Sequence, residues 1–229
     1  MKNGFIIILG ILIFACEKNS ELVGNAKITT FEDSTSYVIG ADIGENLKRQ
    51  NIDLNYGIFL SGVVDAYDMK DIQIDKNERR KIMMTLQKSL REKAQQQVEN
   101  NLKEADEFIK SNKVKNLDVK ETPSGLQYRV IKEGDGDSPG PNDRVKVYYT
   151  GRLIDGTIFD STTDDQPSMF YANQVIKGWT EGLQLMKVGS KFELFIHPNL
   201  GYGSRAKSSI PANSLLIFEL ELLDIVEKK

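Results

Sequence analysis

The hydrophobic positions of this chain follow two different periods, one in each half. In the N-terminal half, apolar side chains recur at every fourth position of an otherwise polar segment: Ile82, Leu86, Leu90, Ala94, Val98 and Leu102. This segment contains no Gly and no Pro, the strongest helix breakers, and Asp75 followed by Glu78 resembles the capping box that starts many helices. The spacing therefore predicts one helix over residues 78–111, about 50 Å long.

The apolar stripe of this helix is narrow, and a narrow stripe cannot bury a helix on several sides. We therefore expect a long stalk helix over residues 76–121, with much of its surface in water. The alternative is a solvated surface helix on a compact domain. The length of the helix favours the stalk.

Two shorter helices are predicted upstream, in an all-helical module over residues 31–75. The first, 34–51, has apolar residues spaced by four, and Gly40 and Gly44 share one of its faces. Glycine lowers helix propensity, so close approach of another helix is the expected reason for this pair. The second helix spans 56–67. Two short helices form a smaller core than independent stability usually needs, which favours a homodimer paired through the N-terminal helices.

The C-terminal half, residues 122–229, alternates apolar and polar positions with a period of two, which is typical of β-strands. The alternation is clearest at Leu126, Tyr128, Val130, Val145, Val147, Tyr149, Phe218, Leu220 and Leu222. Asp155-Gly156 separates two β-prone runs and predicts a hairpin turn, and a short helix fits over 176–186. We expect an α+β domain in which an antiparallel sheet is covered by one short helix.

The first sixteen residues carry an apolar run, 5–14, behind one positive charge. The run is too short to span a bilayer as a helix, which needs about 20 residues, and it matches the apolar region of a signal peptide. Ala15 then precedes Cys16, the one cysteine of the chain. This order resembles a bacterial lipoprotein signal, in which Cys16 becomes lipidated and anchors the protein in the membrane. The alternative is an ordinary secretory signal with an incidental cysteine.

With such a signal, residues 17–30 form a flexible tether. The protein is then expected to be an extracytoplasmic lipoprotein, on the periplasmic face of the outer membrane or at the cell surface.

Composition narrows the possible chemistry. The formal net charge of -3 opposes nucleic-acid binding, which usually needs a basic excess. One His and one Cys cannot form a His/Cys metal cluster or an internal disulfide, and they leave little basis for a Ser-His-Asp or Cys-His arrangement. We predict no cofactor and no metal. We interpret His197 as structural.

Five segments of the C-terminal half resemble the FKBP-type peptidyl-prolyl cis-trans isomerases in order and spacing. They are Val147-Tyr148-Tyr149-Thr150-Gly151, Asp155–Ser161, Gln174–Trp179, Gly201-Tyr202-Gly203 and Leu216–Leu223. Each segment is weak evidence alone, but five in order across one domain are specific. Tyr37–Gly44 and the long helix are similar to the dimerising region of the macrophage infectivity potentiator subgroup. The two resemblances cover nearly all of the chain after the signal.

The resemblance implies an isomerase that acts on proline-containing unfolded or exported polypeptides, in an apolar pocket on a half-barrel sheet wrapped on one short helix. The catalytic residues it implies are Tyr149, Phe159, Asp160, Trp179, Tyr202 and Phe218. The substrate-binding residues it implies are Phe170, Val175, Ile176 and Ile210. Ser168 departs from the family, which often has a second aromatic residue there. The loop 204–209 is basic and serine-rich where other members carry apolar residues.

Each of these residues also has a purely structural explanation. Trp179 and Phe218 would be core residues in many α+β domains, and Asp160 could begin a turn. The functional interpretation rests on all the positions matching one family in order. Two other functions stay open on the same scaffold, each with incidental isomerase activity: a holdase chaperone that grips unfolded chains, and a surface binding module.

Overall fold

The computed structural model describes residues 27–163, 166–207 and 209–227. The predicted signal peptide with Cys16 and most of the predicted tether lie outside the described residues. The chain divides into two compact units, one ending at Leu90 and the other beginning at Arg91. Within the described ranges, no helix is both long enough and apolar enough to cross a membrane.

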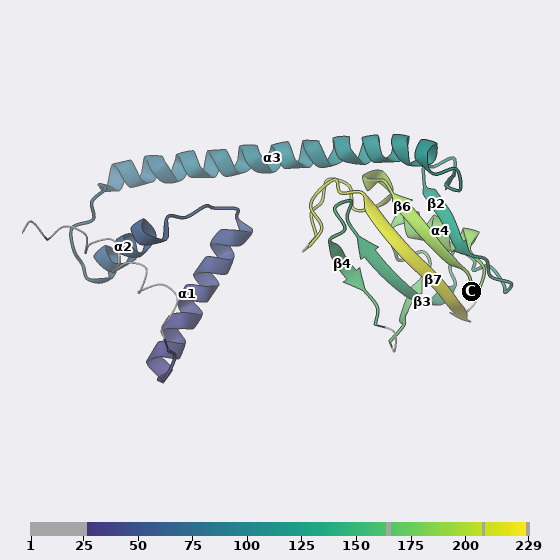
Figure 1. Ribbon diagram of the computed structural model, residues 1–229, viewed down its shortest axis with the longest axis horizontal. Helices are drawn as coiled ribbons and strands as arrows, with labels where there is room; N and C mark the ends of the chain where they lie inside the picture. Colours follow the sequence, from purple (N-terminus) through teal and green to yellow (C-terminus); the bar gives the residue numbers. More distant parts are fainter. Residues whose placement is uncertain (1–26, 164–165, 208, 228–229) are drawn as a thin grey trace, which may run out of the picture. The chain divides into compact units, whose positions relative to one another are not determined.

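The N-terminal unit contains helix α1 (Phe31–Arg49), helix α2 (Tyr56–Tyr67) and the first turns of helix α3 (Lys76–Lys115) (Figure 1). Helix α1 begins before the predicted residue 34, because Thr30 and Asp33 form a reciprocal capping box. None of the described residues in α1 or α2 is buried. The apolar faces of these two helices therefore lie open in a single copy of the chain.

Helix α3 begins where the sequence predicts it. The Asp75 carboxylate accepts hydrogen bonds from the backbone N–H groups of Asn77 and Glu78, which supplies the expected cap. The helix ends at Lys115, four residues beyond the predicted helix 78–111 but six residues short of the predicted stalk 76–121, whose last two residues form strand β1 (Lys120–Glu121) instead.

The C-terminal unit is built on a seven-stranded antiparallel sheet with the order β1-β2-β6-β7-β3-β4, in which β5 also pairs with β3. The strands are β1 (Lys120–Glu121), β2 (Gln127–Lys132), β3 (Arg144–Arg152), β4 (Ile158–Ser161), β5 (Ser168–Tyr171), β6 (Lys191–Ile196) and β7 (Leu216–Glu227). The remaining elements are α4 (Lys177–Leu185) and the 3-10 helix η1 (Pro198–Leu200). The predicted fold class, helical N-terminal region followed by an antiparallel sheet with one short helix, is confirmed.

Helix α4 packs closely on one face of the sheet. A Cβ atom at Gly178 would lie 2.7 Å from Ile196 Cγ2, and one at Gly182 would lie 2.7 Å from Leu194 Cδ1. The two glycines thus let the helix backbone approach β6. Around this contact lies the main core, which includes the fully buried Val145, Val147, Leu183, Leu220 and Leu222.

The opposite face of the sheet is partly covered by the last turns of α3. Ala105, buried in the helix, shares a second hydrophobic cluster with Phe195, Leu215 and Ile217. Phe108 stacks at a tilt against Phe195, with ring centroids 5.8 Å apart. The sequence pattern of a solvated stalk did not anticipate this contact, because the apolar residues near the helix end depart from the four-residue stripe.

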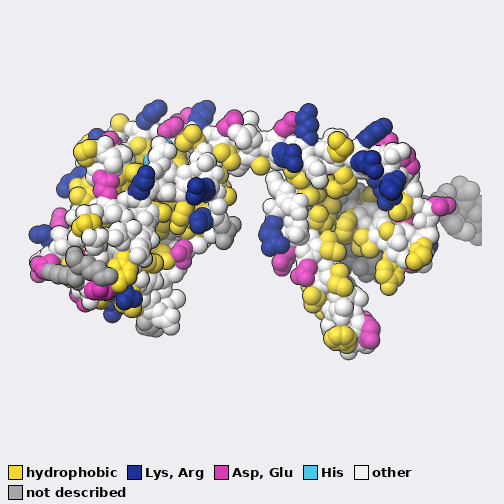
Figure 2. Space-filling model, turned by 180° about the vertical axis from the view of Figure 1, so that it is seen from behind, with side chains coloured by type: hydrophobic (Ala, Val, Ile, Leu, Met, Phe, Trp, Pro, Cys, Tyr) yellow, Lys and Arg dark blue, Asp and Glu magenta, His cyan; other side chains and the backbone are white. Residues whose placement is uncertain are grey.

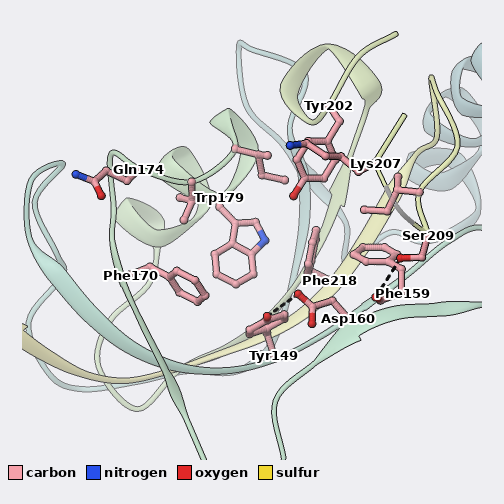
Figure 3. A pocket seen from close by; sticks show the side chains of 13 residues that line it. Tyr149, Phe159, Asp160, Phe170, Gln174, Trp179, Tyr202, Lys207, Ser209 and Phe218 are labelled. Carbon is pink, nitrogen blue, oxygen red and sulfur yellow. Dashed lines mark hydrogen bonds between the residues drawn. The ribbon is translucent and has the colours of Figure 1, made fainter. Parts of the chain in front are cut away.

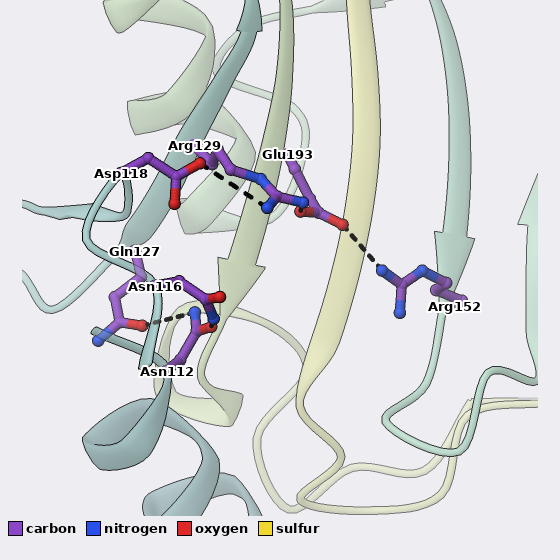
Figure 4. Close-up of polar contacts among 7 residues, drawn as sticks. All are labelled: Asn112, Asn116, Asp118, Gln127, Arg129, Arg152 and Glu193. Atoms are coloured by element: carbon purple, nitrogen blue, oxygen red, sulfur yellow. Dashed lines mark hydrogen bonds and ion pairs between the residues drawn. The ribbon is translucent and has the colours of Figure 1, made fainter. Parts of the chain in front are cut away.

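Polar groups fix the register between α3 and the sheet (Figure 4). Buried Asn112 donates to Gln127 Oε1 over 3.0 Å, and Gln127 Nε2 donates to the backbone oxygen of Ile109 over 2.9 Å. Beside this pair, the buried carboxylate of Glu193 bridges Arg129 and Arg152, at 2.6 and 2.8 Å. The side-chain N and O atoms of Asn112, Gln127 and Glu193 all have partners, as burial requires.

Candidate active site

A pocket of about 590 Å³ opens between α4, the ends of the central strands and the loop after η1 (Figure 3). It is lined by Tyr149, Phe159, Asp160, Phe170, Gln174, Val175, Ile176, Trp179, Tyr202, Lys207, Ser209, Ile210 and Phe218. All ten site residues predicted from the sequence are in this list. They come from six separate parts of the chain: β3, β4, β5, the start of α4, the loop after η1, and β7.

Trp179 is the centre of the pocket. Its side chain is 4 % exposed and meets the rings of Tyr149 and Phe218 edge to face, each with centroids 5.1 Å apart. Phe170 makes a third edge contact at 5.6 Å. This geometry is favourable for aromatic pairs. It leaves a rigid apolar surface suited to a flat or puckered apolar ring.

The wall beside Trp179 depends on a glycine. A Cβ atom at Gly151 would lie 2.6 Å from ring atoms of both Phe159 and Phe218. The absent side chain lets these two rings meet edge to face, with centroids 5.4 Å apart. The Gly151 backbone on β3 is therefore part of the shape of the pocket.

Two polar side chains meet inside this apolar frame. The Tyr149 hydroxyl donates to Asp160 Oδ2 over 2.7 Å (Figure 3). Burial, then the hydrogen bond to Asp160 and the charge of that carboxylate, raises the pKa of the Tyr149 phenol. The phenol therefore remains a donor, and it holds the Asp160 carboxylate at the pocket edge.

The indole Nε1 of Trp179 is buried and has no hydrogen-bond partner among the described residues. The backbone N–H of Ile176 lies at the N-cap of α4, where it is outside the hydrogen bonds of the helix itself. The Tyr202 hydroxyl is the other donor on this side. The pocket thus combines apolar walls with a few donors that can hold carbonyl groups.

Three lining residues, Gln174, Lys207 and Ser209, were not in the predicted set. The basic character of the loop 204–209 was visible in the sequence, but not which of its residues turns toward the pocket. Ser209 Oγ donates to the backbone oxygen of Phe159 over 3.4 Å, which joins this loop to β4. Ser168, flagged as a departure from the family, lies on β5 opposite Val147 and does not line the pocket.

The C-terminal unit is thus an α+β domain, in which an antiparallel sheet with one helix on its face carries an aromatic pocket. Two family models match the chain. Residues 136–223 match FKBP-type peptidyl-prolyl cis-trans isomerase, and residues 32–130 match the domain amino terminal to that isomerase.

Individual relatives agree with the family models over nearly the whole chain. An FKBP-type peptidyl-prolyl cis-trans isomerase, FkpA, of Aeromonas hydrophila is 38% identical over 95% of this chain and 91% of its own length. The outer membrane protein MIP of Legionella longbeachae is 40% identical over 86% of this chain and 87% of its own length. The crystal structure of FkpA from Escherichia coli superposes with a TM-score of 0.65 at 32% identity, covering 89% of this chain and 100% of that chain.

The chain belongs to the FKBP-type peptidyl-prolyl cis-trans isomerases. It is an enzyme that rotates X-Pro amides, and its substrates are proline-containing polypeptides.

Proposed function

We propose that the Trp179 pocket is the site of X-Pro isomerisation and that this chain assists the folding of exported proteins. The observation that carries the proposal is the convergence of ten side chains, expected from separate sequence segments, on one apolar cavity.

The reaction needs no nucleophile, because no covalent bond is broken. Rotation about the X-Pro amide is opposed by a barrier of about 18–20 kcal/mol that arises from amide resonance. Water supports that resonance by hydrogen-bonding the carbonyl oxygen. A pocket that replaces water by apolar walls weakens this support, and a pocket that binds the twisted amide better than the planar one lowers the barrier.

In this mechanism the indole of Trp179 forms the floor under the proline ring. The walls are formed by Tyr149, Phe159, Phe170, Val175, Ile176, Ile210 and Phe218. The Ile176 N–H and the Tyr202 hydroxyl hold substrate carbonyls. Asp160, kept at the edge by Tyr149, directs a negative charge into the site.

An assay of cis-trans exchange on a Leu-Pro or Phe-Pro peptide tests this assignment, with Tyr202→Phe and Asp160→Ala beside the wild type. We expect clear acceleration by the wild type and slower exchange by both variants. Glu181→Ala is a matched control, because this residue lies on α4 and bonds Ser124 outside the pocket. Folded variants with undiminished rates would place the reaction elsewhere.

A second activity, a holdase chaperone, is favoured by the open apolar faces of α1 and α2. Tyr37, Ile58 and Tyr67 are each more than half exposed, and hydrophobic side chains gather on these helices, at the right of the view in Figure 2. Suppression of aggregation of a proline-free client separates the two activities, because isomerisation cannot protect such a client. If Tyr202→Phe protects it as well as the wild type, the holdase activity is independent of the pocket.

The same faces support a homodimer through a dimerisation module at 31–75, which helix α3 (Lys76–Lys115) would join to an isomerase domain at 122–229. Apart from the neighbouring residues and the backbone of α1 itself, a Cβ atom at Gly40 or Gly44 would meet none of the described residues within 4 Å. A second copy is thus the neighbour that would explain the glycine pair. Sedimentation equilibrium should give a dimer for the wild type and a monomer for Gly44→Leu, whereas Ile131→Asp in the other unit should remain dimeric.

We place the protein outside the cytoplasm, anchored by lipid at Cys16. One relative is named an outer membrane protein, and the apolar run before Cys16 matches a lipoprotein signal. Mass spectrometry of the membrane-extracted protein should find acyl chains on an N-terminal Cys16. Release of Cys16→Ser into the soluble extracytoplasmic fraction would support the anchor. Unchanged membrane retention of that variant would contradict it.

A further inference from the structure

The pocket contains a positively charged side chain that takes no part in the isomerase mechanism described above. Lys207 is exposed, lines the pocket, and lies with its ammonium 5.7 Å from the centroid of the Tyr202 ring. Figure 3 shows the side chain of Lys207 along this ring, at the top of the pocket in this view, with Tyr149 and Asp160 at the bottom. At this distance the ring face attracts the ammonium and limits where it can go.

The backbone also fixes this lysine. Lys207 N–H donates to the oxygen of Ile210 over 2.9 Å, and Ile210 N–H donates back over 2.6 Å. Ile210 is itself a buried wall residue of the pocket. The position of the Lys207 backbone is therefore tied to the apolar wall that would contact the proline.

Among the described residues, Lys207 makes no ion pair, although the carboxylate of Asp160 lines the same pocket. Asp160 is instead held by the Tyr149 hydroxyl, on the opposite side of the pocket from Lys207. The pocket thus has a negative edge at Asp160 and a positive edge at Lys207. A bound peptide that crosses Trp179 meets both.

We propose that Lys207 is a specificity-determining residue that makes this isomerase prefer prolines flanked by Asp or Glu. The inference rests on the proposed function of the pocket. A carboxylate beside the proline would pair with the Lys207 ammonium while the proline ring rests on Trp179. A lysine or arginine at the same position of the substrate would be repelled.

The test compares Ala-Glu-Pro-Phe with Ala-Gln-Pro-Phe, and Ala-Ala-Pro-Glu with Ala-Ala-Pro-Gln, because each pair differs only in charge. We expect the glutamate peptide of at least one pair to have about two- to fivefold higher kcat/KM at low salt, as an exposed ion pair allows. The advantage should shrink as salt rises from about 0.02 M to about 0.5 M.

Three variants make the test specific to Lys207. Lys207→Gln should abolish the Glu-over-Gln ratio, and Lys207→Arg should keep it. Arg205→Gln is the matched control, since it removes one positive charge from the same loop at a residue that does not line the pocket. The ratio should survive in this control. Equal rates for both peptides in the wild type, or a ratio that Lys207→Gln leaves intact, would overturn the proposal.

Binding gives a readout that does not depend on turnover. Trp179 is the one tryptophan of the chain and lies in the pocket, so its fluorescence should report peptide binding. If the wild type accelerates neither peptide, the proposed isomerase site fails, and the ratio of the two Kd values still decides the charge preference. If it accelerates and binds both peptides equally, isomerisation stands and the specificity is refuted.

Discussion

Asn101 on α3 donates a side-chain hydrogen bond of 2.8 Å to the backbone oxygen of Ala212, 111 positions later in the chain. A second hydrogen bond runs in the opposite direction, from the Asn213 side chain to the backbone oxygen of Val98 on α3, over 3.3 Å. Asn213 also has a positive φ of 57° and donates its backbone N–H to Gly203. The helix thus holds the segment that carries Ile210 into the pocket wall.

Removing this contact should loosen the pocket wall. Asn101→Ala is expected to lower the free energy of unfolding by about 0.5–1.5 kcal/mol, the usual net worth of one hydrogen bond. It should also raise KM more than it lowers kcat, since the displaced segment binds substrate. Gln96→Ala is the control, because its amide bonds Asn100 within the helix. Indistinguishable KM values for the two variants would show that α3 does not position the wall.

Trp179→Ala should remove most of the substrate affinity. The side chain is 4 % exposed and contacts three aromatic rings, so its loss leaves a large cavity that costs about 3–5 kcal/mol of stability. Urea unfolding followed by circular dichroism measures this cost and confirms that the variant is folded at assay temperature. Trp179→Phe should retain more stability and part of the activity. Full activity in a folded Trp179→Ala protein would be incompatible with the floor assignment.

The Tyr149–Asp160 pair should make stability depend on pH in the alkaline range. The pKa of Tyr149 is raised in the folded protein, so below about pH 10 the phenol is protonated in both states and its stabilising effect is fully present. As pH rises above that value the unfolded phenol ionises first, and the free energy of unfolding falls.

Tyr149→Phe should lack this alkaline component. The free energy of unfolding of the wild type minus that of the variant should stay constant up to about pH 9. Above that pH the difference should decrease, because only the wild type loses the contribution of Tyr149. The pKa of Lys191 is also raised, by its hydrogen bond to Glu219, but this group is present in both proteins and cancels. A difference that does not change with pH would refute the coupling.

The buried amide pair between α3 and β2 should be costly to break on one side. Asn112→Ala leaves Gln127 Oε1 without its donor, which should cost about 1–3 kcal/mol. The double variant Asn112→Leu/Gln127→Met should lose less stability than the sum of the losses in the single variants Asn112→Leu and Gln127→Met. Denaturant unfolding of the four proteins in this cycle measures the coupling. Additive effects would mean that the two side chains act independently.

The sequence alone determined the elements whose signals are local. Periodicity predicted the three N-terminal helices, and α2 has the predicted bounds. The alternation in β3 and β7 was visible as a pattern. The family resemblance carried by five ordered motifs implied the ten pocket residues, eight of which lie within the motifs; Phe170 and Ile210 lie outside them. Such signals can be read from the sequence because they depend on residues that are close together in the chain.

The tertiary structure decided the contacts between distant segments. No local pattern joins Asn101 to Ala212, or shows that Ala105 shares a core with Ile217. The same holds for Lys207, because a residue in a polar loop can face solvent or a pocket with the same sequence around it. The direction of the Lys207 side chain follows from the paired backbone hydrogen bonds with Ile210 and from the contact with the Tyr202 ring. These contacts form only once the sheet and α4 have packed.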